Sequence, residues 1–343
     1  MINLSKNTGP FIILAILLVF CLIANLSLGS VSVPLKFVFR SLFGGTIENE
    51  SWQYIIQDYR LPKAITAIIV GSGLGISGLL MQTLFRNPLA GPFVLGISSG
   101  ASLGVALVIM GATFFGATFA ALLVSKWSLI IASSLGSFIV LLVVITVSSK
   151  VRDTMAILII GLMFASITAA LVSVLSYFAS AEQLQQYIFW GFGSLGNLSW
   201  SEVLILFLIY IFGLFLSIVS IKALNTLLLG ENYAKSLGLN LKQSRMIIII
   251  ATSLLAGTIT AFAGPIAFIG LAIPHIARQI FSTSNHKILL PAIFLIGAMV
   301  MLICDSIAQI PMSDYTLPIN AITSLFGAPI VIWLLVRKRK MIF

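Results

Sequence analysis

Apolar and polar stretches alternate along the chain with the spacing of a protein that crosses a membrane many times. Nine apolar runs are each long enough, at about 20 residues, to span about 30 Å of hydrocarbon as a helix. They cover residues 11–29, 62–82, 93–113, 128–148, 154–177, 202–221, 246–263, 288–308 and 319–336. A tenth segment, 265–280, holds only a short apolar run between two prolines, so its length alone would also allow a re-entrant loop.

The positions of the basic residues favour a crossing for this tenth segment. If it crosses, all but five of the 19 Lys and Arg residues fall on one side; the five are Lys36, Arg40, Arg60, Lys63 and Lys126. By the positive-inside rule the larger group is cytoplasmic. If it did not cross, the basic tail 337–340 would lie opposite the basic loop 222–245. We therefore predict an all-α polytopic membrane protein with about ten transmembrane helices and both termini in the cytoplasm.

Composition supports this interpretation and excludes an ordinary soluble domain. Hydrophobic residues make up 59% of the chain and charged residues only 8%, against about a quarter charged in soluble proteins. The net charge of +10 is spread between apolar runs and does not form a basic face, so it indicates topology and not a nucleic-acid partner. Cys21 and Cys304 fall inside apolar runs, and we expect them to be small buried residues without a disulfide.

The polar turn between the runs 62–82 and 93–113 is the most distinctive stretch of the chain. Its sequence RNPLAGP contains a structural elbow of Arg86, Asn87, Pro88 and Pro92, which lipid would not tolerate because the backbone groups would lack partners. The flanking runs carry glycines at helical spacing that predict close helix packing. These glycines are Gly71, Gly75 and Gly78 before the elbow and Gly96, Gly100 and Gly104 after it.

Residues 60–104, RLPKAITAIIVGSGLGISGLLMQTLFRNPLAGPFVLGISSGASLG, resemble the signature of FecCD-type permeases. These are the membrane subunits of iron-siderophore, haem and vitamin B12 ABC importers. The resemblance covers about residues 52–337 and implies a type II ABC importer permease fold, read here as a single transmembrane permease domain over 1–343. It also implies an inverted repeat that relates spans two to five to spans seven to ten. Lys63 stands where the family usually has Arg, and Gly91 and Thr316 stand where it usually has an acidic residue.

Two cations, Arg60 and Lys63, flank Leu61-Pro62 at the start of the second span, where the helix dipole disfavours positive charge. The family pattern implies that they dock carboxylates of a substrate-binding protein. The alternative is that both side chains snorkel to lipid headgroups.

The loop 222–245 contains GENYAKSLGLN, which resembles the coupling helix that sits in a groove of the ATPase in FecCD permeases. We predict a short helix over 231–237 with one apolar side and a left-handed cap at its end. The candidate coupling residues are Gly230, Glu231, Tyr233, Ala234, Lys235, Leu237 and Gly238, with Tyr233, Ala234 and Leu237 on the apolar side. The alternative is a helix that lies on lipid.

The sequence carries no motif for phosphate cradling, zinc hydrolysis or a nucleophile elbow, so we predict no catalytic residue and no metal site. ATP and Mg²⁺ are expected on a partner ATPase, with no cofactor bound by this chain. His275 and His286 are expected to be solvated or interfacial. Asp305, the acidic residue clearly inside a span, is expected to reach headgroups or a backbone donor, and an ion-coupling role is the alternative.

The resemblance predicts a permease subunit that moves a ferric siderophore or similar iron chelate from a binding protein into the cytoplasm. Vitamin B12 and haem are alternative cargoes, and an ion-coupled secondary transporter and a membrane-embedded enzyme are the alternative classes. The expected partners are a second permease subunit, identical or homologous, two ATPase subunits and an extracytoplasmic substrate-binding protein. The expected location is the bacterial cytoplasmic (inner) membrane.

Overall fold

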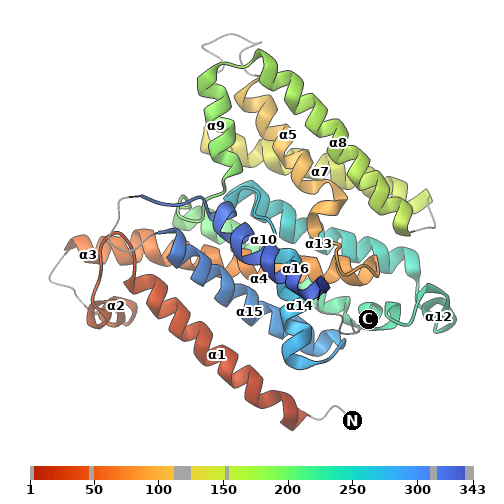
Figure 1. Ribbon diagram of the computed structural model, residues 1–343, viewed down its shortest axis with the longest axis horizontal. Helices are drawn as coiled ribbons and strands as arrows, with labels where there is room; N and C mark the ends of the chain where they lie inside the picture. Colours follow the sequence, from red (N-terminus) through yellow and green to blue (C-terminus); the bar gives the residue numbers. More distant parts are fainter. Residues whose placement is uncertain (1–3, 46–49, 112–124, 151–153, 310–314, 337–343) are drawn as a thin grey trace. The chain divides into compact units, whose positions relative to one another are not determined.

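A computed structural model describes residues 4–45, 50–111, 125–150, 154–309 and 315–336, and this part of the chain is helical without a strand (Figure 1). A helix lies at each of the ten predicted segments. These helices are α1 (Leu4–Ser27), α4 (Leu61–Leu84), α5 (Ile97–Ile109), α7 (Lys126–Lys150), α8 (Thr154–Phe178), α10 (Trp200–Val219), α13 (Leu241–Ala263), α14 (Ile269–Phe281), α15 (His286–Ala308) and α16 (Ile319–Val336).

Seven of these helices are long and apolar enough to cross a membrane, whereas α5, α14 and α16 are shorter. The predicted run 93–113 is only partly one helix. Pro92–Leu95 form a short 3-10 turn, η2, and α5 begins after Gly96, which has a left-handed φ of 74°. Glycine adopts this conformation without steric cost, so the chain can change direction here. Crossing of the membrane by the three shorter helices stays a prediction.

Several short helices lie between the long ones. Between α8 and α10 lies α9 (Ala181–Gly191), which begins with a capping box between Ser180 and Gln183. The loop 222–245 contains α11 (Ile221–Leu227) and α12 (Glu231–Ser236). The sequence did not reveal α2 (Leu35–Leu42), nor the helical segment formed by α3 (Glu50–Tyr54) and the π-helix η1 (Ile55–Arg60) that leads directly into α4.

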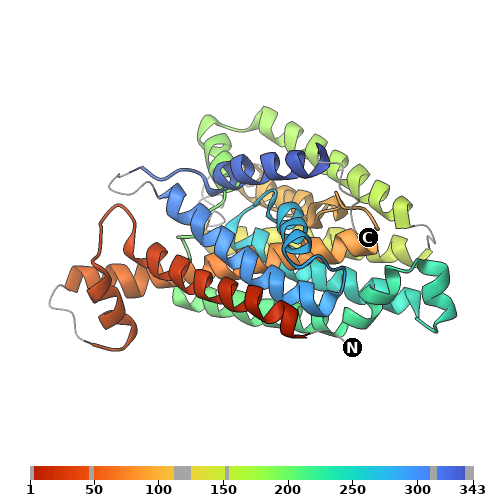
Figure 2. The same ribbon diagram turned by 60° about the horizontal axis from the view of Figure 1, so that its bottom comes forward.

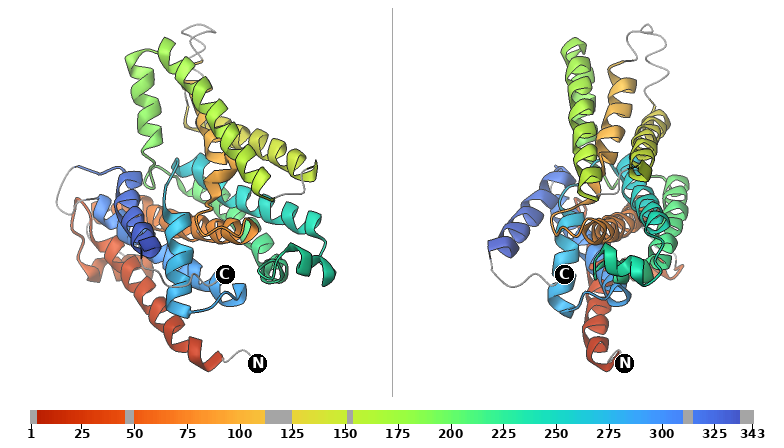
Figure 3. Two further views of the ribbon diagram at one scale, coloured as in Figure 1. Left: turned by 45° about the vertical axis from the view of Figure 1, so that its right-hand side comes forward. Right: turned by 90° about the vertical axis from the view of Figure 1, so that its right-hand side faces the viewer.

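The chain divides into two compact units. The first contains Met1–Ile76, Ser194–Leu208 and Ile266–Phe343, and the second contains Ser77–Gly193 and Ile209–Pro265. In the first unit α1 packs on α15, and α14, α15 and α16 contact one another. In the second unit α5, α7 and α8 contact one another, and α13 packs on α7 and α5 (Figure 3). The single-domain assignment stays a prediction.

The group α5, α7 and α8 and the group α14, α15 and α16 begin with similar local structure. Ala90-Gly91-Pro92 leads to a left-handed residue, Gly96, directly before the 13-residue helix α5. Ala263-Gly264-Pro265 leads to another, Phe268 with φ 66°, directly before the 13-residue helix α14. Helix α5 contacts α7 and α8, and helix α14 contacts α15 and α16. These shared features support the predicted internal repeat.

Candidate functional site

Glycines allow close backbone contact between helices within each unit. In the first unit, a Cβ added to Gly71 of α4 would meet the carbonyl oxygen of Gly297 on α15, and one added to Gly75 would meet Ile293 and Ile273. In the second unit, Gly100 and Gly104 of α5 face the backbone of α7 at Gly136 and Ala132, and Gly96 faces the backbone of α8 at Gly161. Gly78 is buried. The packing of unit 1 brings the start of α4 beside the end of α15, where the polar residues described next lie.

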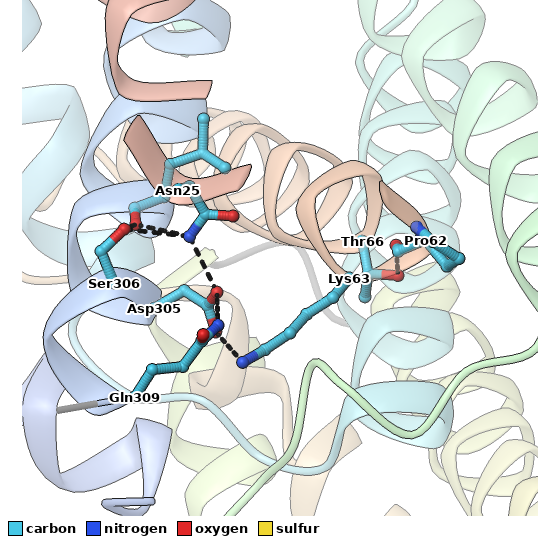
Figure 4. A network of polar contacts seen from close by, with 8 residues as sticks. Asn25, Pro62, Lys63, Thr66, Asp305, Ser306 and Gln309 are labelled. Atoms are coloured by element: carbon cyan, nitrogen blue, oxygen red, sulfur yellow. Dashed lines mark hydrogen bonds and ion pairs between the residues drawn. The ribbon is translucent and has the colours of Figure 1, made fainter. Parts of the chain in front are cut away.

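A buried ion pair joins α4 to α15 (Figure 4). The Lys63 Nζ atom lies 3.0 Å from Asp305 Oδ1, and both residues are buried, at 7% and 2% exposure. The ammonium also lies 5.9 Å from the centre of the Tyr59 ring, within the range of a cation–π interaction. The alkyl stem of Lys63 passes close to Gly196. Lys63 therefore points into the protein and does not reach lipid headgroups, which corrects the snorkelling alternative.

Amide side chains complete the coordination of the Asp305 carboxylate. Its Oδ2 atom accepts hydrogen bonds from Asn25 Nδ2 at 2.9 Å and from Gln309 Nε2 at 3.1 Å (Figure 4). The same Asn25 nitrogen lies 3.0 Å from Ser306 Oγ. A buried charge is tolerated when it is paired and hydrogen-bonded in this way. The expectation that Asp305 reaches headgroups or a backbone donor was wrong, because its partners are the side chains of Lys63, Asn25 and Gln309.

Arg60 closes the turn that follows α1. Its Nη1 atom donates to the carbonyl oxygens of Leu26 and Ser27 at 2.8 and 2.9 Å, and its Nη2 atom donates to the carbonyl oxygen of Val31. Arg60 is 3% exposed. The guanidinium thus satisfies carbonyl groups at the end of α1 that have no partner within the helix.

Arg60 and Lys63 were predicted to dock a substrate-binding protein, and this stays a prediction. The structure adds a condition: each cation would have to leave its internal partners to reach another protein. Sequence reasoning missed Asn25 and Gln309, because an isolated amide in an apolar run carries no functional signal. It found Asp305 but not the partner of its carboxylate.

The elbow has a compact turn structure. Arg86 adopts a left-handed φ of 47° and is exposed. The Asn87 Oδ1 atom accepts a hydrogen bond from the Leu89 N–H at 2.9 Å, and the Asn87 carbonyl accepts one from Ala90 N–H at 3.1 Å. This local bonding replaces the helical hydrogen bonds that Pro88 and Pro92 prevent.

Helix α12 lies beside the elbow in the second unit. Gly230, with φ 100°, precedes α12, and a Cβ added there would lie 3.5 Å from Arg86 Nη1. Glu231 Oε1 pairs with Arg245 Nη2 of α13 at 2.5 Å. Gly238, two residues after the end of α12, has a left-handed φ of 80°. The short helix is therefore tied to α13 and ended by a glycine.

The residues on the predicted apolar side of α12 do not share one environment. Ala234 is fully buried within the chain, whereas Tyr233 is 70% exposed and Leu237 is also exposed. The residues available to a partner are Tyr233 and Leu237, and Lys235 is exposed as well. Placing Ala234 on a surface that contacts a partner was wrong for this reason, and enlarging it would disturb the chain itself.

The two histidines were expected to be solvated or interfacial, and the structure contradicts the first of these. His275 and His286 are buried, at 7% and 1% exposure, so they are not solvated. Among the described residues, no group of three or more His, Cys, Asp or Glu side chains is placed to hold a metal ion.

Comparison with known proteins places this geometry in a family. The family model of the FecCD transport family matches residues 17–337. The chain belongs to the FecCD transport family. It is thus an ABC importer permease and a multi-pass membrane protein.

FecCD relatives match this chain over most of their length. The hemin transport system permease protein HmuU of Yersinia pestis is 34% identical over 98% of this chain and 99% of its own. The vitamin B12 import system permease protein BtuC of Klebsiella pneumoniae is 35% identical over 84% of each chain. A solved structure described as an inward-facing, metal-chelate type ABC transporter superposes with a TM-score of 0.83 and 32% identity, over 96% of this chain and 99% of the other.

Proposed function

We propose that this chain forms, with a second permease subunit, the transmembrane pathway of an importer that carries an iron chelate into the cytoplasm. The cargo would be a ferric siderophore or haem, delivered by a substrate-binding protein and moved by ATP hydrolysis in two partner ATPase subunits. The observation that carries this proposal is the match to the FecCD family over residues 17–337. The relative named for hemin, which aligns over almost the whole chain, supports an iron chelate.

Vitamin B12 is a second candidate cargo, supported by the relatives named for its import. The described residues present no cluster of metal ligands, so a chelated metal held by its own organic ligand suits this chain better than a bare ion. An ion-coupled transporter is less consistent with the site. Asp305 is neutralised by Lys63 and hydrogen-bonded by two amides, so it offers no free carboxylate for proton or sodium coupling.

The proposed contact with the ATPase is the exposed side of α12. Tyr233 and Leu237 are exposed apolar residues and Lys235 is an exposed cation, while Ala234 and the Glu231–Arg245 pair hold the helix to the chain. This arrangement would present a short, firmly held helix to a groove. Both termini and α12 would lie on the cytoplasmic side, as the positions of the basic residues predict.

The test is uptake into proteoliposomes that contain this chain with its partner ATPase and binding protein. We expect accumulation of a labelled ferric siderophore or haem that requires ATP, persists with a protonophore and stops with a catalytically inactive ATPase. Competition among a ferric siderophore, haem and cobalamin would identify the cargo. Uptake that persists with the inactive ATPase and collapses with the protonophore would contradict the proposal.

A further inference from the structure

Helix α2 has one side packed on the protein and another side that is apolar and uncovered. Val38 and Ser41 are buried, and the ring of Phe37 lies 4.9 Å from that of Trp52. The uncovered side consists of four exposed apolar residues. They are Leu35, Phe39, Leu42 and Phe43, of which Phe43 is 85% exposed. A contiguous apolar surface of this kind is typical of an interaction site.

The segment before α2 fixes the helix at the end of α1. The Ser27 hydroxyl donates to the Val33 carbonyl at 2.7 Å, the Val33 N–H donates to the Ser27 carbonyl at 3.1 Å, and Val33 is fully buried. Arg60 holds the same turn through the carbonyl groups of Leu26, Ser27 and Val31. Helix α2 also contacts η1, which leads directly into α4 (Figure 2).

This position places α2 at the level of the membrane surface. Both α1 and the continuous helical segment Glu50–Leu84 are long and apolar enough to cross a membrane. Only the short segment 28–34 separates α2 from α1. A helix packed beside the ends of two spanning helices lies where lipid headgroups meet the acyl chains.

Charge on the flank of α2 favours anionic lipid. Lys36 and Arg40 are exposed, lie one helical turn apart and border the apolar residues, and the sequence from 28 to 45 contains no acidic residue. Long basic side chains beside an apolar helix face can reach phosphate groups while the apolar residues enter the acyl boundary.

We infer that α2 and Phe43 form an interfacial helix that binds the headgroup–acyl boundary of a membrane containing anionic phospholipid. The inference depends on the chain crossing the membrane and not on its cargo, so it stands or fails separately from the proposed function.

Spin labels on the full chain test the depth of α2. In a background with Cys21→Ala and Cys304→Ala, a label is attached to Phe39→Cys on the apolar side or to Arg40→Cys on the basic flank. The protein is placed in vesicles of phosphatidylcholine and phosphatidylglycerol. For each label we measure the ratio of its collision rate with oxygen to its collision rate with a water-soluble nickel chelate. We expect this ratio to be several-fold higher for the label at 39 than for the label at 40.

A second measurement tests the preference for anionic lipid. Lys36→Gln/Arg40→Gln should reduce several-fold the enrichment of spin-labelled phosphatidylglycerol over phosphatidylcholine around the protein. Lys222→Gln/Lys242→Gln, which removes the same charge from other exposed positions, should change it less.

Three outcomes would overturn the inference. The first is equal exposure of the labels at 39 and 40 to the nickel chelate. The second is an unchanged lipid preference in Lys36→Gln/Arg40→Gln. The third is a label at 39 that is wet in vesicles and becomes protected only when the substrate-binding protein is added, which would assign the surface to a protein.

Discussion

Replacing Lys63 alone should destabilise the protein more than replacing Lys63 and Asp305 together. Lys63→Met keeps the length of the side chain but leaves the Asp305 carboxylate buried, with two neutral amides as its partners. Removal of one member of a buried ion pair costs about 3–5 kcal/mol, because the remaining charge has lost its compensation. Asp305→Leu should have a similar cost, since it leaves a buried ammonium group.

The double variant Lys63→Met/Asp305→Leu removes both charges and keeps apolar volume at both sites. Its main loss is the acceptor for Asn25 and Gln309, and Asn25 retains Ser306 Oγ as a partner. A buried polar group that loses a partner costs about 1–3 kcal/mol. We therefore expect the double variant to lose about 1–2 kcal/mol, which is several kcal/mol less than the sum of the two single variants.

Thermal unfolding in detergent can be followed with a thiol-reactive fluorophore, because Cys304 is buried beside Asp305 and reacts when the helices separate. Cys21→Ala provides the background. At about 2 °C per kcal/mol for a chain of this size, Lys63→Met should lower the Tm by roughly 6–10 °C. Lys222→Met, at an exposed position, is the matched control and should change stability by less than about 0.5 kcal/mol.

Affinity for the substrate-binding protein should be measured on the same variants. If Lys63→Met keeps the Tm of its parent but loses this affinity, Lys63 is a docking residue and its pair with Asp305 is not structural. Additive losses in the double variant would also refute the reasoning, because they would show that the two side chains do not interact.

Three further predictions follow from close contacts and exposure. Gly297→Leu should lower the Tm, because its side chain would collide with the backbone of Gly71 and overpacking costs about 1–3 kcal/mol or more. The control Gly191→Ala has open space around it and should leave the Tm unchanged. Tyr233→Asp should weaken copurification with the ATPase at unchanged Tm. Copurification equal to that of the wild type would show that the ATPase does not bind the exposed side of α12. Gly238→Val should cost about 1–2 kcal/mol through its left-handed backbone alone and lower ATP-driven uptake, so wild-type uptake and Tm would contradict its capping role.

The long helices were predictable because hydrophobic run length decides whether a segment can cross a membrane. The same criterion overlooked α2, where Lys36 and Arg40 interrupt an otherwise apolar segment. It also left out the polar helical turns of α3 and η1 that lead into α4. The elbow was recognisable because asparagine and proline break helices in a known way.

The polar contacts were less accessible to sequence reasoning. Lys63 and Asp305 were each noticed as charges in or near spans, but their pairing depends on how α4 packs against α15. Side-chain direction on α12 was also misjudged, because Ala234 fits both a partner-facing and an inward-facing position. Helix α12 packs against both α11 and α13, and local periodicity does not show which of its side chains this packing buries.

The buried network explains how α1 is attached to α15 and α4. The three helices of each group, α5, α7 and α8 or α14, α15 and α16, contact one another. Apolar packing of this kind therefore does not determine which group α1 binds. Asp305 and Gln309, however, lie at the end of α15, and through Asn25 they hold α1, while Lys63 brings in α4. Arg60 then holds the turn that leads from α1 to α2. The polar residues therefore give α1 one defined position against α15 and fix where α2 begins.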